Sequence, residues 1–238
     1  MTTPQKTQPV RTLVISDGSL AALVATAMVS EHLASAGTAA SDELNGIVIS
    51  APSTPTDPGW SACERAAGRQ ADIYGLGFVP PDAAMRARVE AGAALPAGAL
   101  ESLVLTDATY NAAMHGCERV LWPAQAPVVD GEPDLTAVAR VVDRATLVSR
   151  LAALDAERPE WSGLSVREVR IDTPMVDLTD SQIADLALDL RVPVDTCWWW
   201  GTDTPEAARW TPLLVPTKAA GDAEIKPRAA LEQAAIRG

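Results

Sequence analysis

The stretch TLVISDGSLAALVATAMVSEH, residues 12–32, decides the fold of this chain. Its first five residues, Thr12–Ser16, are mostly β-branched or long aliphatic and predict a buried strand. A short polar turn follows, and apolar residues then recur at the spacing of one helix face: Leu20, Leu23, Val24, Ala27 and Met28. A strand, a glycine-containing turn and a helix form the usual first unit of a parallel α/β sheet.

The turn of this unit is the first candidate for a ligand site. A helix N-terminus directs free backbone N–H groups at whatever lies above the turn, and phosphate is the usual occupant. The candidate nucleotide-binding residues are therefore Ser16, Asp17, Gly18 and Ser19. In the alternative interpretation, Asp17 or Ser19 merely caps the helix.

The remaining sequence continues the alternation of strands and helices. GIVIS at Gly46–Ser50 and RVLW at 119–122 predict short buried strands, and residues 166–171 predict a half-buried edge strand. Helices are predicted over 61–74, 99–115, 134–156 and after residue 179, two of them opened by the capping boxes Ser61-Ala62-Cys63-Glu64 and Thr179-Asp180-Ser181-Gln182. The fold class is therefore α/β, with a mainly parallel five-stranded sheet and helices on both faces.

The linking segments complete the predicted domain organisation. Residues 1–11 form a flexible lead, 12–200 the α/β domain, and 201–238 a loop-rich extension with a short helix at 228–236. Residues 77–98 are interpreted as a long, partly helical connection. The loop at 51–59 either lines a site at the sheet edge or is a surface connector.

Charge and composition exclude several classes of protein. The chain has 238 residues, with 19 Lys and Arg against 31 Asp and Glu, a net charge of −12. This balance argues against non-specific nucleic-acid binding, which needs a basic surface. No segment resembles a signal peptide or the roughly 18 apolar residues of a membrane span. The three cysteines, Cys63, Cys117 and Cys197, form no CxxC pair, which fits a reducing cytoplasm.

Three landmarks, in this order, carry a resemblance to a known family: LVISDGSLAALVA at 13–25, LTDATYNAAMHGCERVLW at 105–122 and TPMVDLTDSQIADLALDLRVPVDTCWWWG at 173–201. Together they resemble the PP-loop ATP pyrophosphatase superfamily, most closely its 7-cyano-7-deazaguanine synthase (QueC/ExsB-like) branch. The resemblance covers most of 13–201. It implies an adenine nucleotide alpha hydrolase-like, Rossmann-like fold, with ATP and Mg²⁺ as the family's cofactors.

The loop departs from the family pattern S-G-G-x-D-S. Ser16 and Gly18 keep the first serine and second glycine, but Asp17 replaces the first glycine. Leu20 and Ala21 stand where the family has Asp and Ser, so the magnesium-side carboxylate is missing. A carboxylate facing a polyphosphate is repulsive, by about 1 kcal/mol in water for two unit charges 4 Å apart.

The family's zinc site is also missing. Trp199 falls near the position of the first of four cysteine ligands, and no Cys or His follows Cys197. Tetrahedral zinc needs about four such ligands, so no metal site is predicted. His32 and His115 are interpreted as structural. Tyr110 and Asn111 lie on the helix that borders the nucleotide in the family, and are either core residues or part of a site.

The tryptophans near the C-terminus allow two interpretations. Trp198, Trp199 and Trp200 are consecutive, so no regular element can bury all three on one face. Either they pack locally in place of the zinc knuckle, or together with Trp210 they form an interface for a second subunit or another protein. The family habit of pairing favours a homo-oligomer.

Three functions follow from these observations. The favoured one is a degenerate PP-loop protein without catalytic residues, with a structural, regulatory or partner-binding function, because the loop carboxylate, the first glycine and the zinc ligands are lost together. The second is an active ATP-dependent enzyme that adenylates a carboxylate, with Mg²⁺ held by Asp17, Ser19 or Asp107. The third is a Rossmann-like protein for another nucleotide, which lacks the support of a G-x-G-x-x-G motif.

Overall fold

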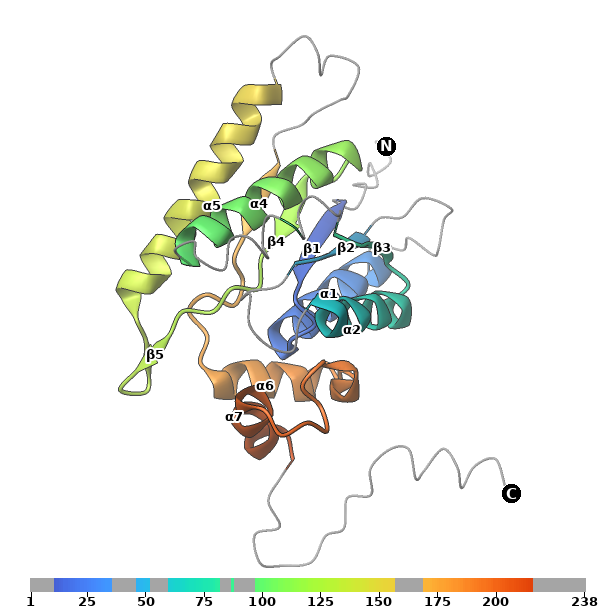
Figure 1. Ribbon diagram of the computed structural model, residues 1–238, viewed down its shortest axis with the longest axis vertical. Helices are drawn as coiled ribbons and strands as arrows, with labels where there is room; N and C mark the ends of the chain where they lie inside the picture. The colour runs from blue at the N-terminus through green and yellow to red at the C-terminus, as the bar shows by residue number, and fades with distance from the viewer. Residues whose placement is uncertain are drawn as a thin grey trace, which may run out of the picture.

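A five-stranded parallel sheet lies at the centre of the computed structural model, which describes residues 11–35, 46–51, 60–81, 87, 97–156 and 169–215 (Figure 1). In sequence order its strands are β1 (Thr12–Ser16), β2 (Gly46–Ser50), β3 (Gly77–Val79), β4 (Arg119–Leu121) and β7 (Arg170–Asp172). They lie in the order β3-β2-β1-β4-β7, and every neighbouring pair is parallel. This confirms the predicted sheet, and the order is that of a doubly wound, Rossmann-like fold.

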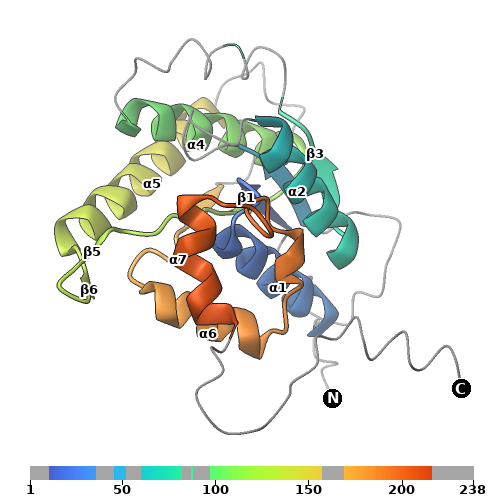
Figure 2. The ribbon, with the colours of Figure 1, turned by 60° about the horizontal axis from the view of Figure 1, so that its bottom comes forward.

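Helices cover both faces of the sheet. The helices α1 (Leu20–Ser35) and α2 (Trp60–Tyr74) cover one face, and α4 (Ala97–Met114) and α5 (Leu135–Ala156) cover the other (Figure 1). The helix α6 (Asp180–Asp189), the 3₁₀ turn η3 (Val194–Thr196) and α7 (Pro205–Leu214) lie outside α1 (Figure 2). A two-stranded hairpin of β5 (Val128–Val129) and β6 (Glu132–Pro133) leads into α5.

The alternation of side chains along the central strand builds two core layers. Leu13 and Ile15 of β1 pack beneath α4 and α5, whereas Val14 packs with α1 and α6. Every residue of β1 and β2 is buried. Burial on both faces explains why these strands are continuous apolar runs rather than alternating ones.

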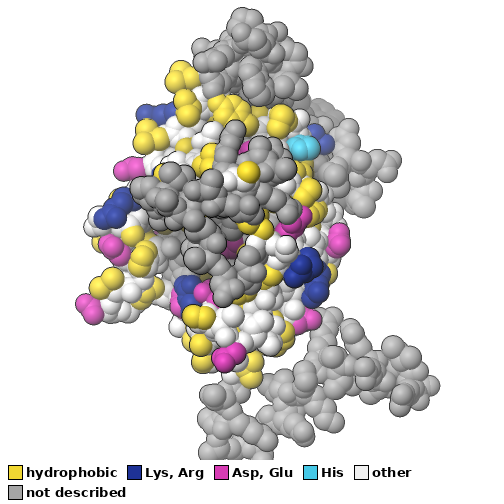
Figure 3. Space-filling view, in the orientation of Figure 1, with side chains coloured by type: hydrophobic (Ala, Val, Ile, Leu, Met, Phe, Trp, Pro, Cys, Tyr) yellow, Lys and Arg dark blue, Asp and Glu magenta, His cyan; other side chains and the backbone are white. Residues whose placement is uncertain are grey.

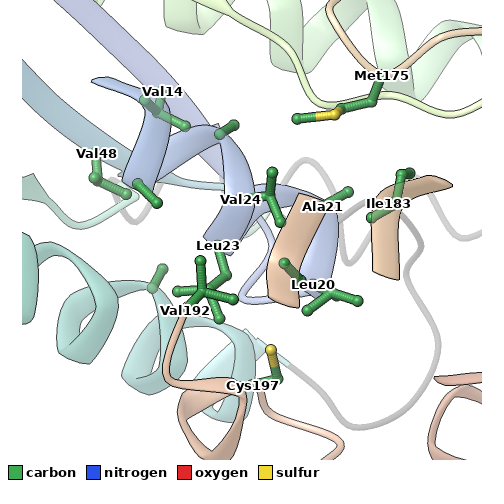
Figure 4. Close-up of a cluster of buried hydrophobic side chains, with 14 of the residues drawn as sticks. Val14, Leu20, Ala21, Leu23, Val24, Val48, Met175, Ile183, Val192 and Cys197 are labelled. Carbon is green, nitrogen blue, oxygen red and sulfur yellow. The ribbon is translucent and has the colours of Figure 1, made fainter. Parts of the chain in front are cut away.

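The helix α1 is buried on more than the single face that its periodicity predicts. All eight residues from Leu20 to Ala27 are buried, because the sheet and α2 cover one side while α6 and the segment after it cover the other. Figure 4 shows Val24 between the strands and Ile183 of α6, with Leu20 on the side of Cys197. A helix that is apolar all round is the pattern expected of such a central position.

Several predicted boundaries are wrong. The strand β3 lies in the segment interpreted as a connection, and its three residues depend on pairing with β2 rather than on a pattern of their own. The helix α2 already begins at Trp60, so Ser61 lies inside its first turn and is not the N-cap. The helix α7 replaces the loop predicted after residue 201. Its two prolines, Pro205 at the start and Pro212 inside, conceal it in the sequence.

Other predictions are confirmed or lie outside the described residues. The capping box at α6 is present, since Gln182 Oε1 accepts from the Thr179 N–H at 2.8 Å and Thr179 Oγ1 accepts from the Gln182 N–H at 3.4 Å. The lead at 1–10, most of the loop at 51–59 and the helix at 228–236 lie outside the described residues. Within the described residues, none of the helices has the length and apolar character needed to cross a membrane.

Candidate functional site

The turn between β1 and α1 is held by its own side chains. Asp17 Oδ1 accepts a hydrogen bond from the Ser19 N–H at 2.9 Å, and Ser16 Oγ accepts from the Gly18 N–H at 3.1 Å. Ser19 then caps α1, because its Oγ accepts from the Ala22 N–H at 3.4 Å. The cap that the alternative interpretation predicts is therefore present in this turn. In a phosphate nest the same N–H groups would instead converge on an anion.

Gly18 is required by the packing of α2. Its φ of +72° is in the left-handed region that favours glycine. A Cβ at this position would lie 2.6 Å from Ala66 Cβ and 2.9 Å from the carbonyl oxygen of Cys63, both in α2. The structure thus places a helix directly against Gly18, one of the candidate nucleotide-binding residues.

The side chain of Gln70 in α2 holds the turn through two hydrogen bonds. This side chain is fully buried, and its Nε2 donates to the carbonyl oxygen of Gly18 at 3.3 Å while its Oε1 accepts from Ser16 Oγ at 3.4 Å. The backbone N–H of Trp198 donates to the same Gly18 carbonyl at 3.3 Å. Sequence reasoning missed Gln70, although a glutamine on the inward face of α2 beside Ala66, Ala67 and Ala71 was a detectable signal.

The sequence position at which the PP-loop proteins that this chain resembles carry a magnesium carboxylate is part of the core in this structure. Leu20 is fully buried and Ala21 is 7% exposed, both in the cluster shared by α1 and α6. Leu20 therefore offers no oxygen to a cation at this edge of the sheet. Asp107, another proposed magnesium ligand, accepts a hydrogen bond from Asn111 Nδ2 at 3.2 Å. It is not among the residues that line the pocket at the carboxyl edge of the sheet.

A pocket of about 160 Å³ opens at the carboxyl edge of the sheet, between the ends of β1 and β4. In a doubly wound sheet this is the switch point, where neighbouring connections leave in opposite directions and ligands usually bind. Its lining is Ile15, Asp17, Ala51, Glu101, Val104, Trp122, Pro123, Ala124 and Gln125. The two ionisable side chains among these residues, Asp17 and Glu101, are both acidic, and Glu101 is paired with Arg144 of α5.

The rim of this pocket is tied to α6 and α7 through Gln125. Its Nε2 donates to Asp180 Oδ1 at 2.8 Å and to the Leu178 carbonyl at 3.0 Å, and its Oε1 accepts from Arg209 Nη2 at 2.7 Å. Arg209 also binds Asp180 through two donors, at 2.6 and 2.7 Å, and lies 4.5 Å from the ring centroid of Trp210. The hydrogen bonds from Arg209 lower the pKa of Asp180 below its ordinary value.

Asp180→Asn should reduce the free energy of unfolding by about 1 kcal/mol at pH 7, since the ion pair is partly exposed. The lowered pKa means that the pair stabilises the fold above the unfolded-state pKa of about 3.9 and is lost as pH falls through the folded-state value. The difference between the two proteins should therefore shrink as the pH falls below the unfolded-state pKa of about 3.9. Urea unfolding at pH 7 and at a series of lower pH values measures it, with exposed Asp185→Asn as the control; a difference that stays constant as the pH falls contradicts the assignment.

The tryptophans divide between core and surface. Trp199 is fully buried and Trp210 is 1% exposed, so the interface prediction is wrong for these two residues. Trp198 is partly buried against the core, and Trp200 is 37% exposed. The chain turns at these positions, so consecutive indoles point in different directions, and the local-packing alternative holds for the buried pair.

Assembly with a second subunit stays a prediction. The exposed apolar side chains available for it include Trp200 and three leucines along α5, Leu147, Leu151 and Leu154. Figure 3 shows hydrophobic side chains at the upper left, where α5 lies in Figure 1.

Cysteine and histidine take no part in the pocket. Burial raises the pKa of the Cys63 thiol to about 12 and that of Cys117 to about 11, and it also raises the pKa of Cys197. His32 and His115 are exposed. Among the described residues, no group of three or more His, Cys, Asp or Glu side chains is arranged to hold a metal ion.

Comparison with known proteins gives only distant structural likenesses. No family model matches the sequence, and no curated protein matches it. The structure is similar to the U34-tRNA thiolase NcsA from Methanococcus maripaludis with its [4Fe-4S] cluster, at 13% identity and a TM-score of 0.44, over 93% of this chain and 79% of that one. It is also similar to NMN synthetase from Francisella tularensis, at 13% identity and a TM-score of 0.43, over 92% and 90% of the two chains. The fold itself is defined by the strand order and the parallel pairing of the sheet.

Proposed function

We propose that this protein is a degenerate member of the PP-loop superfamily that does not cleave ATP to AMP and pyrophosphate, and that it has a binding or regulatory function instead. The three sequence landmarks and the doubly wound strand order support the superfamily. The first landmark supplies the turn after β1, and the third supplies Trp198, whose N–H binds that turn. A closer relation to the QueC/ExsB-like branch rests on the landmarks alone.

One observation carries the proposal: the amide groups of the turn already have acceptors. The Ser19 N–H binds Asp17 Oδ1 and the Gly18 N–H binds Ser16 Oγ. A phosphate would have to displace both oxygens, one of which belongs to an anion. Since the net contribution of a hydrogen bond is only about 1 kcal/mol, the larger obstacle is the charge of Asp17 at the mouth of the turn.

The missing magnesium carboxylate supports the same conclusion. Phosphoryl and adenylyl transfer depend on a cation that offsets charge on the leaving pyrophosphate. Leu20 is fully buried at the position where the family supplies an oxygen ligand. Loss of the loop geometry and of this ligand together should remove turnover as well as tight binding.

Titration calorimetry with Mg-ATP and a pyrophosphate-release assay test the proposal. We expect a dissociation constant above about 1 mM, equivalent to binding weaker than roughly 4 kcal/mol, and no pyrophosphate above the rate of a protein-free blank. Asp17→Gly frees the Ser19 N–H and removes the charge, whereas Asp17→Asn removes the charge but keeps an acceptor. Affinity for ATP should therefore rise more with Gly than with Asn, without turnover in either.

The second candidate, an active Mg-ATP enzyme, is favoured by one observation: Asp17 and Glu101 line the same pocket and present two carboxylates to it. Carboxylate oxygens are the ligands that Mg²⁺ prefers. Under this alternative, wild-type protein binds ATP at micromolar concentration and Asp17→Gly abolishes that binding. Steady pyrophosphate release by the wild type would decide in its favour.

A further inference from the structure

We infer that the pocket at the carboxyl edge of β1 and β4 binds a small organic cation with an apolar body, an amine held by Asp17. This inference rests on the proposed function, because it assigns to the same edge of the sheet a ligand whose charge is opposite to that of a nucleotide. Three properties of the pocket support it: its volume, its apolar lining and its acidic charge.

The volume fits a single ring. A closed apolar cavity of about 150 Å³ in another protein takes up benzene, and this pocket measures about 160 Å³. A six-membered ring with a short substituent therefore fills it. A nucleoside triphosphate has several times as many atoms and would extend far beyond the lining.

The wall is mostly apolar and belongs to a preformed core layer. Ile15, Ala51, Val104 and Trp122 line the pocket, and all four are part of the buried cluster beneath α4. They come from β1, the end of β2, α4 and the end of β4, so the wall is fixed by four packed elements. Such a wall favours an apolar ligand body, at roughly 25 cal/mol for each Å² removed from water.

The charge in the pocket comes from Asp17. The other acidic lining residue, Glu101, is paired with Arg144. Within the described part of the chain, no ion pair reaches Asp17, whose Oδ1 accepts from the Ser19 N–H and whose Oδ2 has no hydrogen bond of its own there. A charge-assisted hydrogen bond from an ammonium group is about twice as strong as a neutral one, and no Lys or Arg of the described lining competes for it.

Gln125 also lines the pocket, but its amide has no free group to offer a ligand. Both ends of its amide are engaged, with Arg209 on the oxygen and with Asp180 and Leu178 on the nitrogen. These bonds hold Gln125 in place, and we therefore assign the preference for a positively charged ligand to Asp17.

The test compares three probes of the same ring size: benzylamine, benzyl alcohol and benzoate, titrated into the full-length protein and followed by amide chemical shifts. We expect benzylamine to shift the amides of Ile15, Ala51 and Ala124 with a millimolar or lower dissociation constant. Benzyl alcohol should bind at least tenfold more weakly and benzoate not at all. Equal binding of the three probes, or no binding of benzylamine, overturns the inference.

Two variants locate the charge. Asp17→Asn keeps the acceptor for Ser19 and should weaken benzylamine binding tenfold or more, while Asp185→Asn, an exposed acid of α6, should leave it unchanged. Equal loss in both variants overturns the assignment to Asp17; if Asp17→Asn does not fold, the ranking of the three probes on wild-type protein decides. The outcomes are separable from those of the proposed function. Pyrophosphate release overturns the proposed function, whereas equal binding of benzoate overturns only this inference.

Discussion

Gly18→Ala should lower the free energy of unfolding by about 3 kcal/mol or more, the largest effect expected of so small a change in this chain. A residue other than glycine at φ of +72° costs roughly 1–2 kcal/mol. The new Cβ would also lie 2.6 Å from Ala66 Cβ and 2.9 Å from the Cys63 carbonyl, and such overpacking adds about 1–3 kcal/mol. Urea unfolding followed by circular dichroism measures the sum.

Gly201→Ala is the matched control for this prediction. Gly201 has the same φ of +72°, but a Cβ there meets nothing within 4 Å among the described residues. It should therefore lose only the backbone cost of roughly 1–2 kcal/mol. The difference between the two variants isolates the close approach of α2. Equal destabilisation would show that α2 can move away and that packing does not require glycine at position 18.

The presence of glycine at position 18 thus has a structural explanation that does not need a phosphate. A glycine in a PP-loop leaves room for a phosphate because it has no Cβ. Gly18 leaves room for α2 for the same reason. Gln70 and Trp198 both donate to the Gly18 carbonyl. In this structure the turn around Gly18 is therefore part of the packed core.

Trp199→Ala should lower the free energy of unfolding by about 3–5 kcal/mol, the range for removing a fully buried large side chain. Trp199 is among the largest fully buried residues and packs in the cluster shared by α1, α6 and α7. The loss leaves a cavity that this cluster can close only in part. Thermal and urea unfolding of the purified variant check the value.

Trp200→Ala supplies the neighbouring control. This side chain is 37% exposed, so its removal should cost no more than about 1 kcal/mol. Light scattering on the same samples tests the predicted oligomer. If Trp200→Ala changes the assembly state without changing monomer stability, the exposed indole is an interface residue. Comparable destabilisation by both substitutions would contradict the division between core and surface.

The sequence by itself determined the elements whose signals are local. The β1–turn–α1 unit follows from an apolar run, a glycine and a helical period within 25 residues. The capping box at Thr179 lies within four residues and is present as predicted. The parallel sheet follows from the alternation of such units, and the turn at 16–19 lies at its carboxyl edge because it follows β1 directly.

Tertiary structure alone decided which groups hold that turn in place. The bond between Ser16 and Gln70 joins residues 54 positions apart, and the packing of Gly18 against Ala66 joins α2 to the turn. The short-range periodicity of a sequence does not predict such contacts, because the same local pattern is compatible with many different distant partners. For the same reason, the sequence did not predict that Trp199 is buried while its neighbour Trp200 is exposed. It also did not predict the strand β3, which depends on pairing with β2. The pocket between β1 and β4 exists only where strands distant in sequence end side by side and the connections between them diverge.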